Sequence, residues 1–146
     1  MSQVLDEIST AIKNLSLESS VVRVINDEDL YKNLLNHFVK GGDRRWWWES
    51  FNVESNSKSF SDGLGYKRLP VIVPDKDEVV WFMVEDDQLP NYPIFECSIS
   101  NAVKIIGECF AFEYYLISKN LQWLLCENHH DRVIGIGSKL DFGNAI

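Results

Sequence analysis

The chain has 146 residues, of which 45% are hydrophobic, and a formal net charge of −8 at pH 7. A chain of this length can bury a substantial core, so we expect residues 1–146 to form a single domain. The negative charge argues against nucleic acid or an anionic membrane surface as the main partner, since both select basic proteins, and no run of residues approaches the ~20 apolar positions of a membrane span.

The N-terminal sequence MSQVLDEIST lacks the basic and apolar regions of a signal peptide, which predicts a cytoplasmic protein. The three cysteines, Cys97, Cys109 and Cys126, are odd in number and fall on faces of predicted strands or helices. We therefore expect them to be reduced core residues and not parts of a disulfide framework.

Two helices are predicted in the N-terminal part of the chain. The first has an apolar stripe at helical spacing, formed by Val4, Leu5, Ile8, Ala11, Ile12 and Leu15. β-Branched residues at 21–25 predict a short strand. A second helix follows the polar residues 26–29 and is expected to end at Gly41 and Gly42, because glycine favours the C-cap conformation.

Residues 44–51, RRWWWESF, predict a strand in which Trp46 and Trp48 face one side and Trp47 faces the other. Tryptophans commonly anchor a core, since each buries a large area. Alternatively, one ring is exposed and forms a hot spot for a protein partner, a role in which Trp is enriched. Both interpretations stay open, and all three tryptophans are candidate partner-binding residues.

The middle of the chain predicts a loop followed by a hairpin. Residues 52–67 are polar and have no hydrophobic period, which is typical of a long loop. Residues 79–84 are apolar on both faces and predict a central strand, which pairs with a strand at 94–97 across a turn that contains prolines.

Acidic residues are concentrated around this hairpin. Seven acids and a single lysine lie between Asp75 and Glu96, so this region carries most of the net charge. Glu85, Asp86 and Asp87 are therefore candidates for steering a basic partner into contact.

A third helix is predicted at 99–111. Six apolar residues repeat there on one face of a helical period, namely Ile99, Ala102, Val103, Ile106, Cys109 and Phe110. Ser98 or Ser100 can cap the first turn. Gly107 is unfavourable inside a helix, and the expected reason for it is close packing of the helix on the sheet.

After this helix the hydrophobic period changes to two, which predicts three antiparallel strands at 112–118, 121–126 and 132–137. The first two are apolar on both faces and are expected inside the sheet. Asn120 is expected to supply the positive φ of the turn that joins them. Two glycines in the third strand indicate that another segment packs closely against it.

Together these elements predict an α+β fold. Its centre is a mostly antiparallel, strongly twisted sheet of about five to seven strands, which is a usual sheet size. The two N-terminal helices and the helix at 99–111 are expected to cover one face of this sheet.

The polar loop after the second of these strands is the candidate for chemistry; it contains Glu127, Asn128, His129, His130 and Asp131. Adjacent histidines diverge on a short turn, and zinc sites usually need a second ligand pair elsewhere, so we expect no metal and no cofactor. One interpretation is that these side chains only stabilise the hairpin turn. The other is that the loop carries a function, as loops often do.

Five segments of the chain resemble a family of small uncharacterised bacterial cytoplasmic proteins: WWWESF at 46–51, VVWFMVEDD at 79–87, YPIFECS at 92–98, IIGECFAFEYYLIS at 105–118 and WLLCENHHDRVIGIG at 123–137. This resemblance implies no established activity and no catalytic residues. In size, charge and tryptophan-bearing strands the chain is also similar to SUKH-type immunity proteins, which bind and neutralise toxins delivered between bacteria. That second likeness implies a role but assigns no residue.

The sequence therefore favours a non-enzymatic binding protein, and the first hypothesis is neutralisation of a basic toxin by occlusion. The alternative is a small hydrolase or transferase that uses the loop at 127–131, with both imidazoles converging on a second acid such as Glu108 or Glu113 beside a concave pocket. A third hypothesis is a structural adaptor that dimerises through a sheet edge. The oligomeric state is left open.

Overall fold

The computed structural model describes residues 3–39, 47, 51, 53–86, 88–89, 91–109 and 112–144. In this part of the chain, seven strands form one sheet in the order β1-β4-β3-β5-β6-β7-β2, and each neighbouring pair is antiparallel. The strands are β1 (Val22–Arg23), β2 (Asn56–Ser59), β3 (Val79–Val84), β4 (Ile94–Ser98), β5 (Tyr114–Ile117), β6 (Leu124–Glu127) and β7 (Arg132–Ile136). The helices are α1 (Gln3–Asn14), α2 (Glu28–Phe38), α3 (Leu69–Ile72) and α4 (Ile99–Glu108), with the short 3-10 helices η3 (Gly65–Arg68) and η4 (Phe142–Asn144). The predicted α+β fold is confirmed.

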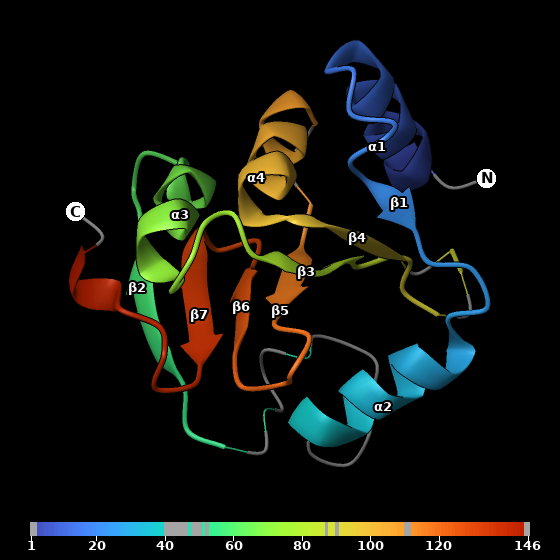
Figure 1. Ribbon diagram of the computed structural model, residues 1–146. Helices are drawn as coiled ribbons and strands as arrows, with labels where there is room; N and C mark the ends of the chain where they lie inside the picture. The colour runs from blue at the N-terminus through green and yellow to red at the C-terminus, as the bar shows by residue number, and fades with distance from the viewer. Residues whose placement is uncertain are drawn as a thin grey trace.

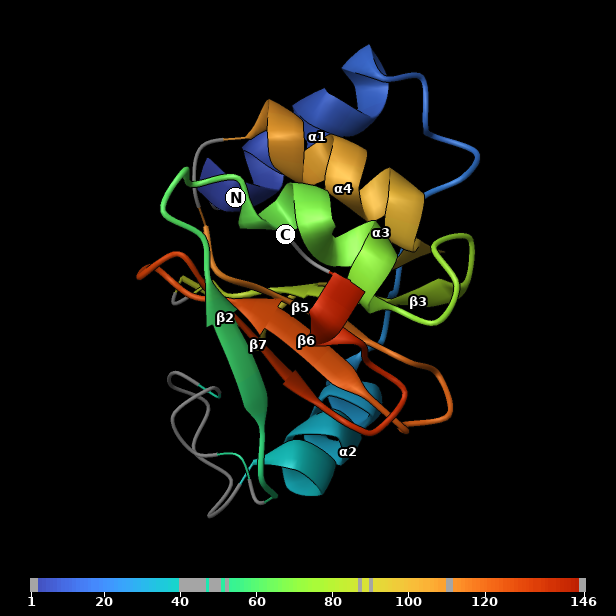
Figure 2. The same ribbon diagram turned by 90° about the vertical axis from the view of Figure 1, so that its left-hand side faces the viewer.

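Helices cover both faces of the sheet. Figure 2 shows α1, α3 and α4 together on one face and α2 alone on the other. The expectation that both N-terminal helices share one face is therefore wrong. The reason is the position of β1, which pairs with β4 at the edge of the sheet and lies between α1 and α2 in the chain (Figure 1). The chain crosses from one face to the other at this edge.

Two hydrophobic cores result, one on each face of the sheet. Tyr114 and Leu116 belong to the core beneath α1, α3 and α4, whereas Tyr115 and Ile117 belong to the core beneath α2. This alternation, predicted from the period of two, is confirmed, and β5 and β6 are interior strands as expected. Each such fully buried side chain stabilises the fold by roughly 1.5–3 kcal/mol relative to an exposed one.

Helix α4 is shorter than predicted. Ser98 caps its start, since the hydroxyl oxygen accepts a hydrogen bond from the backbone N–H of Asn101 at 3.1 Å. The helix ends at Glu108, and Cys109 already has an extended backbone. Gly107 does not pack on the sheet as expected. It is exposed, and the atoms nearest to a Cβ built on it belong to Tyr66 in η3.

The long loop predicted at 52–67 is wrong in two places. Residues Asn56–Ser59 form β2, which pairs with β7 and is polar because it is an edge strand whose side chains are largely exposed. Residues Gly65–Arg68 form η3, which continues directly into α3. Neither element has the apolar period on which the prediction relied.

The tight turns of the C-terminal meander follow the prediction only in part. The positive φ between β5 and β6 is at Leu121 (φ 60°) and not at Asn120. The Ser118 hydroxyl oxygen accepts hydrogen bonds from the backbone N–H groups of Gln122 and Trp123, which holds this turn without a glycine.

The two glycines of β7 and its following turn are packed as predicted. A Cβ on Gly135 would lie 2.5 Å from Leu140 Cδ1, and a Cβ on Gly137 would lie 2.5 Å from the carbonyl oxygen of Gln122. Both positions therefore require glycine, because a segment after β7 and the β5–β6 turn approach the backbone there.

Four other predictions concern the cysteines, the membrane, the end of the second helix and the tryptophan segment. Cys97, Cys109 and Cys126 are free thiols, as expected. None of the helices in the described ranges has the length and hydropathy needed to cross a membrane. The prediction that the second helix ends at Gly41 and Gly42 is wrong, because α2 ends at Phe38 and Val39 already has an extended backbone. The predicted strand at 44–51 lies outside the described residues, apart from Trp47 and Phe51.

Candidate functional site

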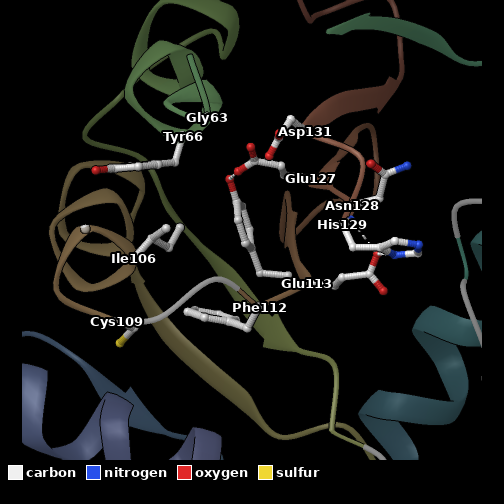
Figure 3. Close-up of a pocket in the computed structure, with 12 residues that line it drawn as sticks. Gly63, Tyr66, Ile106, Cys109, Phe112, Glu113, Glu127, Asn128, His129 and Asp131 are labelled. Atoms are coloured by element: carbon white, nitrogen blue, oxygen red, sulfur yellow. Dashed lines mark hydrogen bonds and ion pairs between the residues drawn. The ribbon is translucent and has the colours of Figure 1, made fainter. Parts of the chain in front are cut away.

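A cavity of about 410 Å³ opens at one end of the sheet, between α4, η3 and the adjoining ends of β5 and β6 (Figure 3). Its volume lies within the range of small-ligand pockets, ~300–1,000 Å³. The described residues that line it are Gly63, Tyr66, Ile106, Gly107, Cys109, Phe112, Glu113, Tyr114, Glu127, Asn128, His129 and Asp131. We call this the α4 cavity.

The central wall of the α4 cavity is a hydrogen-bonded pair, Tyr114 and Glu127. These residues face each other in the β5–β6 register, and the Tyr114 hydroxyl donates to Glu127 Oε1 at 2.8 Å. The other carboxyl oxygen, Oε2, lies where a Cβ on Gly65 would be only 2.8 Å away. Gly65 therefore provides the space that this carboxyl group occupies.

Burial perturbs the ionisation of both members of this pair. Burial raises the pKa of Glu127, the charge of Asp131 raises it further, and the hydrogen bond from Tyr114 offsets part of the increase. Burial also raises the pKa of Tyr114 well above its usual value, and the nearby Glu127 carboxyl adds to this effect. The Tyr114 hydroxyl thus remains a hydrogen-bond donor at any physiological pH. Burial makes Glu127 a weaker acid than an exposed glutamate.

A second acidic group, Glu113, holds the polar loop in place. Glu113 Oε2 accepts a hydrogen bond from the backbone N–H of His129 and contacts the Nδ1 atom of the same residue, both at 2.9 Å. Burial by itself raises the pKa of Glu113, but hydrogen bonds with Glu85 and His129 outweigh burial and lower the pKa overall. The Glu113 side chain is 13% exposed, so this contact fastens the loop to the end of β5.

Asn128 has the turn-stabilising role that one interpretation of the loop predicts. Its buried side-chain oxygen accepts hydrogen bonds from the backbone N–H groups of His130 and Arg132, at 2.9 and 3.2 Å. The His130 ring packs on the His129 ring, with 4.0 Å between centroids, and His130 is not among the described lining residues. The His129 imidazole meets an acid, Glu113, in the lining of the cavity, as the enzyme hypothesis expects, whereas His130 is not part of the described lining.

The described lining of the α4 cavity is acidic and aromatic. It includes three carboxyl groups and one imidazole, without any lysine or arginine, and three aromatic rings, those of Tyr66, Phe112 and Tyr114. Burial raises the pKa of the Cys109 thiol to about 11, so at neutral pH this group is protonated and is a poor nucleophile. In the described ranges, no group of three or more His, Cys, Asp or Glu residues could hold a metal ion.

The candidate partner-binding residues that the structure describes, Trp47, Glu85 and Asp86, do not line the α4 cavity. Trp47 is 0% exposed and packs on Tyr115, with 5.3 Å between ring centroids, so its ring anchors the core beneath α2 and is not available to a partner. Asp86 is 6% exposed, and its Oδ1 accepts a hydrogen bond from the Gln88 N–H. Glu85 accepts a hydrogen bond from the Tyr92 hydroxyl. Trp46, Trp48 and Asp87 lie outside the described residues.

Sequence reasoning found the polar loop but missed the opposite wall of the cavity. Tyr66 lies in a segment predicted to be a loop, and Gly107 was assigned to packing against the sheet. Tyr114 was identified only as a strand residue, because its contact with Glu127 depends on the register between two strands. The alternation of β5 was a usable signal, since it places Tyr114 on the α4 side.

Comparison with known proteins identifies a family but no function. Residues 2–143 match the model of a family that is described as a family of unknown function (DUF6756). No match is found among curated proteins or among solved structures. The geometry of the α4 cavity is therefore the basis for any functional argument.

Proposed function

We propose that this chain, which belongs to the DUF6756 family of unknown function, is a non-enzymatic binding protein. In this proposal the α4 cavity receives a cationic group of a basic protein partner. The observation that carries this proposal is the composition of the described lining, which combines three carboxyl groups with three aromatic rings and includes no basic residue other than His129. Carboxylates and aromatic faces both attract cations.

The magnitudes support a cation over an anion or a neutral ligand. Two unit charges about 4 Å apart interact by roughly 4 kcal/mol at the effective dielectric constant near a protein surface. A desolvated cation over an aromatic ring adds about 2 kcal/mol. An anionic ligand would instead meet three carboxyl groups and one half-exposed imidazole.

The biological role that we propose is neutralisation of a toxin by occlusion, as in SUKH-type immunity proteins. The net charge of −8 supports this role, because an acidic surface speeds association with a basic protein. Glu85 and Asp86 offer little direct contact surface to such a partner, since Asp86 is buried and Glu85 is half-buried. The product of a gene directly upstream is the first partner to test.

The direct test is a titration of isotopically labelled protein with a lysine- and arginine-rich peptide, followed by NMR. We expect the largest shift changes at Glu113 and at residues 127–131, and weaker binding for Glu127→Gln. The matched control is Glu54→Gln, which removes the same charge from an exposed position outside the cavity lining. Equal binding of a glutamate-rich peptide, or shift changes confined to another face, would reject the proposal.

A second candidate function is a small hydrolase, and one observation favours it. Burial raises the pKa of Glu127, which is the property of a general acid, and the Glu113–His129 contact lies in the same lining. Among the described lining residues, the Cys109 thiol is a poor nucleophile because it stays protonated at neutral pH, so water is the nucleophile to consider. Turnover of any compound in a panel of chromogenic esters, phosphates and glycosides, abolished by Glu127→Gln, would favour the enzyme over the binding protein.

The adaptor hypothesis has less support from the sheet. Its two edge strands in the described part of the chain are β1, with two residues, and β2, with four. Short edge strands are a usual protection against edge-to-edge pairing. Elution as a monomer in gel filtration would exclude dimerisation through either edge, whereas a dimer disrupted by a proline in β2 would support it.

A further inference from the structure

We propose that the α4 cavity selects an organic cation with an alkylated nitrogen, such as a methylated ammonium group, and that Gly107 sets the size of the group admitted. This inference rests on the proposed function and narrows it. It is carried by three features of the cavity: one oxygen of each glutamate carboxyl group already accepts a hydrogen bond, aromatic rings form part of the walls, and Gly107 leaves room in the lining that a side chain would take.

The first feature is the hydrogen bonding of the two carboxyl groups. Glu113 Oε2 already contacts the backbone N–H and the ring Nδ1 of His129. Glu127 Oε1 accepts from Tyr114, and its Oε2 lies against Gly65. A primary ammonium carries three N–H donors and a guanidinium five, and each donor that loses water needs a new acceptor. In each of these two glutamates, one carboxyl oxygen is therefore already engaged in a hydrogen bond within the protein, which favours a cation that needs few acceptors.

The second feature is the arrangement of the rings. Phe112 and Tyr114 meet at 63° with 5.9 Å between centroids, so they form a corner. Figure 3 shows Tyr66 and Ile106 across the same space from Glu127, with Phe112 below them. Aromatic rings arranged around a site are the usual means of binding alkylated ammonium ions, which have few or no N–H groups to satisfy.

The third feature is Gly107. Glycine is one of the poorest helix formers, and Gly107 lies inside α4 without the positive φ found at Gly63 and Gly137. The three atoms nearest to a Cβ added there would all belong to the Tyr66 side chain, at 3.4–3.8 Å, which is ordinary van der Waals contact. At Gly65, by contrast, a Cβ would collide with the Glu127 carboxyl. The fold therefore requires glycine at 65 but not at 107, where the bare backbone only keeps the cavity wide.

A methylated ammonium group can come from two sources, a methylated lysine on a protein or a free metabolite with the same head group. The cavity recognises the head group in either case, because charge and ring faces act on it alone. A trimethyllysine peptide and free choline carry the same head group and separate the two sources: tighter binding of the peptide indicates a protein-borne group, and tighter binding of choline indicates a free one.

The test is calorimetric titration of the purified protein with four chloride salts at constant ionic strength: tetramethylammonium, methylammonium, ammonium and guanidinium. We expect tetramethylammonium to bind about tenfold more tightly than ammonium or guanidinium, as the gain from ring contacts implies. Phe112→Leu should weaken tetramethylammonium binding about tenfold. Phe142→Leu is the matched control, since it changes a half-buried phenylalanine packed against the same core but outside the cavity lining.

Gly107→Ala tests the size argument with a second readout. We expect Tm to rise by about 3 °C, because alanine is a better helix former and the protein is of intermediate size, while tetramethylammonium binding falls and methylammonium binding is unchanged. A rise in Tm with unchanged tetramethylammonium binding would overturn the role of Gly107. If guanidinium or ammonium binds more tightly than tetramethylammonium, and Glu127→Gln abolishes that binding, the preference for an alkylated head group is wrong. The proposed function, binding of a cation in the α4 cavity, would still stand. Binding of none of the four cations would overturn both.

Discussion

Tyr114 and Glu127 are directly opposite each other across the β5–β6 ladder, and the Tyr114 hydroxyl donates a 2.8 Å hydrogen bond to Glu127 Oε1. This pair places an acid between two packed layers, where burial raises its pKa. Ionisation of a carboxyl group in such a position lowers the free energy of unfolding. Natural proteins retain destabilising groups of this kind mainly at functional sites. The first predictions concern this pair.

Glu127→Gln is expected to stabilise the protein at neutral pH. The folded-state pKa of Glu127 is raised above its unfolded value by burial, so ionisation disfavours the folded state as pH rises through the folded pKa. Glutamine keeps an acceptor for the Tyr114 hydroxyl and cannot ionise. In thermal denaturation series, Tm of Glu127→Gln should exceed that of the wild type near pH 7, and the difference should shrink as pH falls toward about 3, below the unfolded-state pKa of about 4.3, where both states of the wild type are largely protonated. Glu54→Gln should show no such pH-dependent gain.

Tyr114→Phe is expected to destabilise the fold by about 1–3 kcal/mol, because it leaves a buried carboxyl group without its donor. Tyr115→Phe is the matched control. Its hydroxyl is buried and has no hydrogen-bond partner in the part of the chain that the structure describes, so its removal should be neutral or slightly stabilising. Urea denaturation of the two variants measures the contrast. Equal losses in both would show that the Tyr114–Glu127 hydrogen bond is not what stabilises this wall.

Glu113→Gln is expected to loosen the polar loop and to destabilise the protein by about 1–3 kcal/mol near pH 7, since it weakens hydrogen bonds to a charged group. Hydrogen bonds with Glu85 and His129 lower the pKa of Glu113 despite its burial. The stability that this group contributes is therefore present above the unfolded pKa and is lost as pH falls through the folded pKa. Amide exchange at His129 should become faster in the variant near pH 7.

The control for Glu113→Gln is Glu96→Gln. Glu96 forms an ion pair with Lys119 at 2.9 Å, but both side chains are 41% exposed. Exposed pairs contribute only ~0–1 kcal/mol. If the two variants lose equal stability, or if His129 exchange is unaffected in Glu113→Gln, the contact between Glu113 and the loop is not what holds the loop.

Gly135→Ala and Gly107→Ala are expected to change stability in opposite directions. An added Cβ at 135 would lie 2.5 Å from Leu140 Cδ1 and 2.9 Å from the Phe142 ring, so this variant should lose about 1–3 kcal/mol through overpacking. The same change at Gly107 should gain about 0.5–1 kcal/mol, the difference in helix propensity. Guanidinium denaturation of both variants measures the contrast, and a loss at Gly107 would reveal a structural role that the contacts do not show.

The alternation of β5 and β6 was predicted well because each strand carries its own signal. A period of two follows from the geometry of one strand and places Tyr115 and Tyr114 on opposite faces without reference to any other segment. The same holds for Ser98, whose hydroxyl caps the turn that follows it directly in sequence. Elements without a local hydrophobic period were not predicted. Strand β2 is the clearest case, because its polar residues give no such period and the strand is defined by its backbone pairing with β7.

The candidate site was predicted on one side only. The loop from Glu127 to Asp131 stands out in the sequence because polar side chains are dense there, whereas Tyr66 and Gly107 are ordinary residues until they face the loop. Strand register brings Tyr114 to Glu127, and the continuation of η3 into α3 brings Tyr66 against α4.

The amino-acid sequence alone determined the fold class, the two-faced strands of the C-terminal meander and the acidic character of the protein, because these depend on composition and on spacing within one segment. The tertiary structure decided which face α2 covers, how the α4 cavity closes and which carboxyl groups become buried. Those properties depend on contacts between segments far apart in the chain. The hydrophobic pattern of one segment predicts which of its faces is buried, but it does not identify the segment that covers that face.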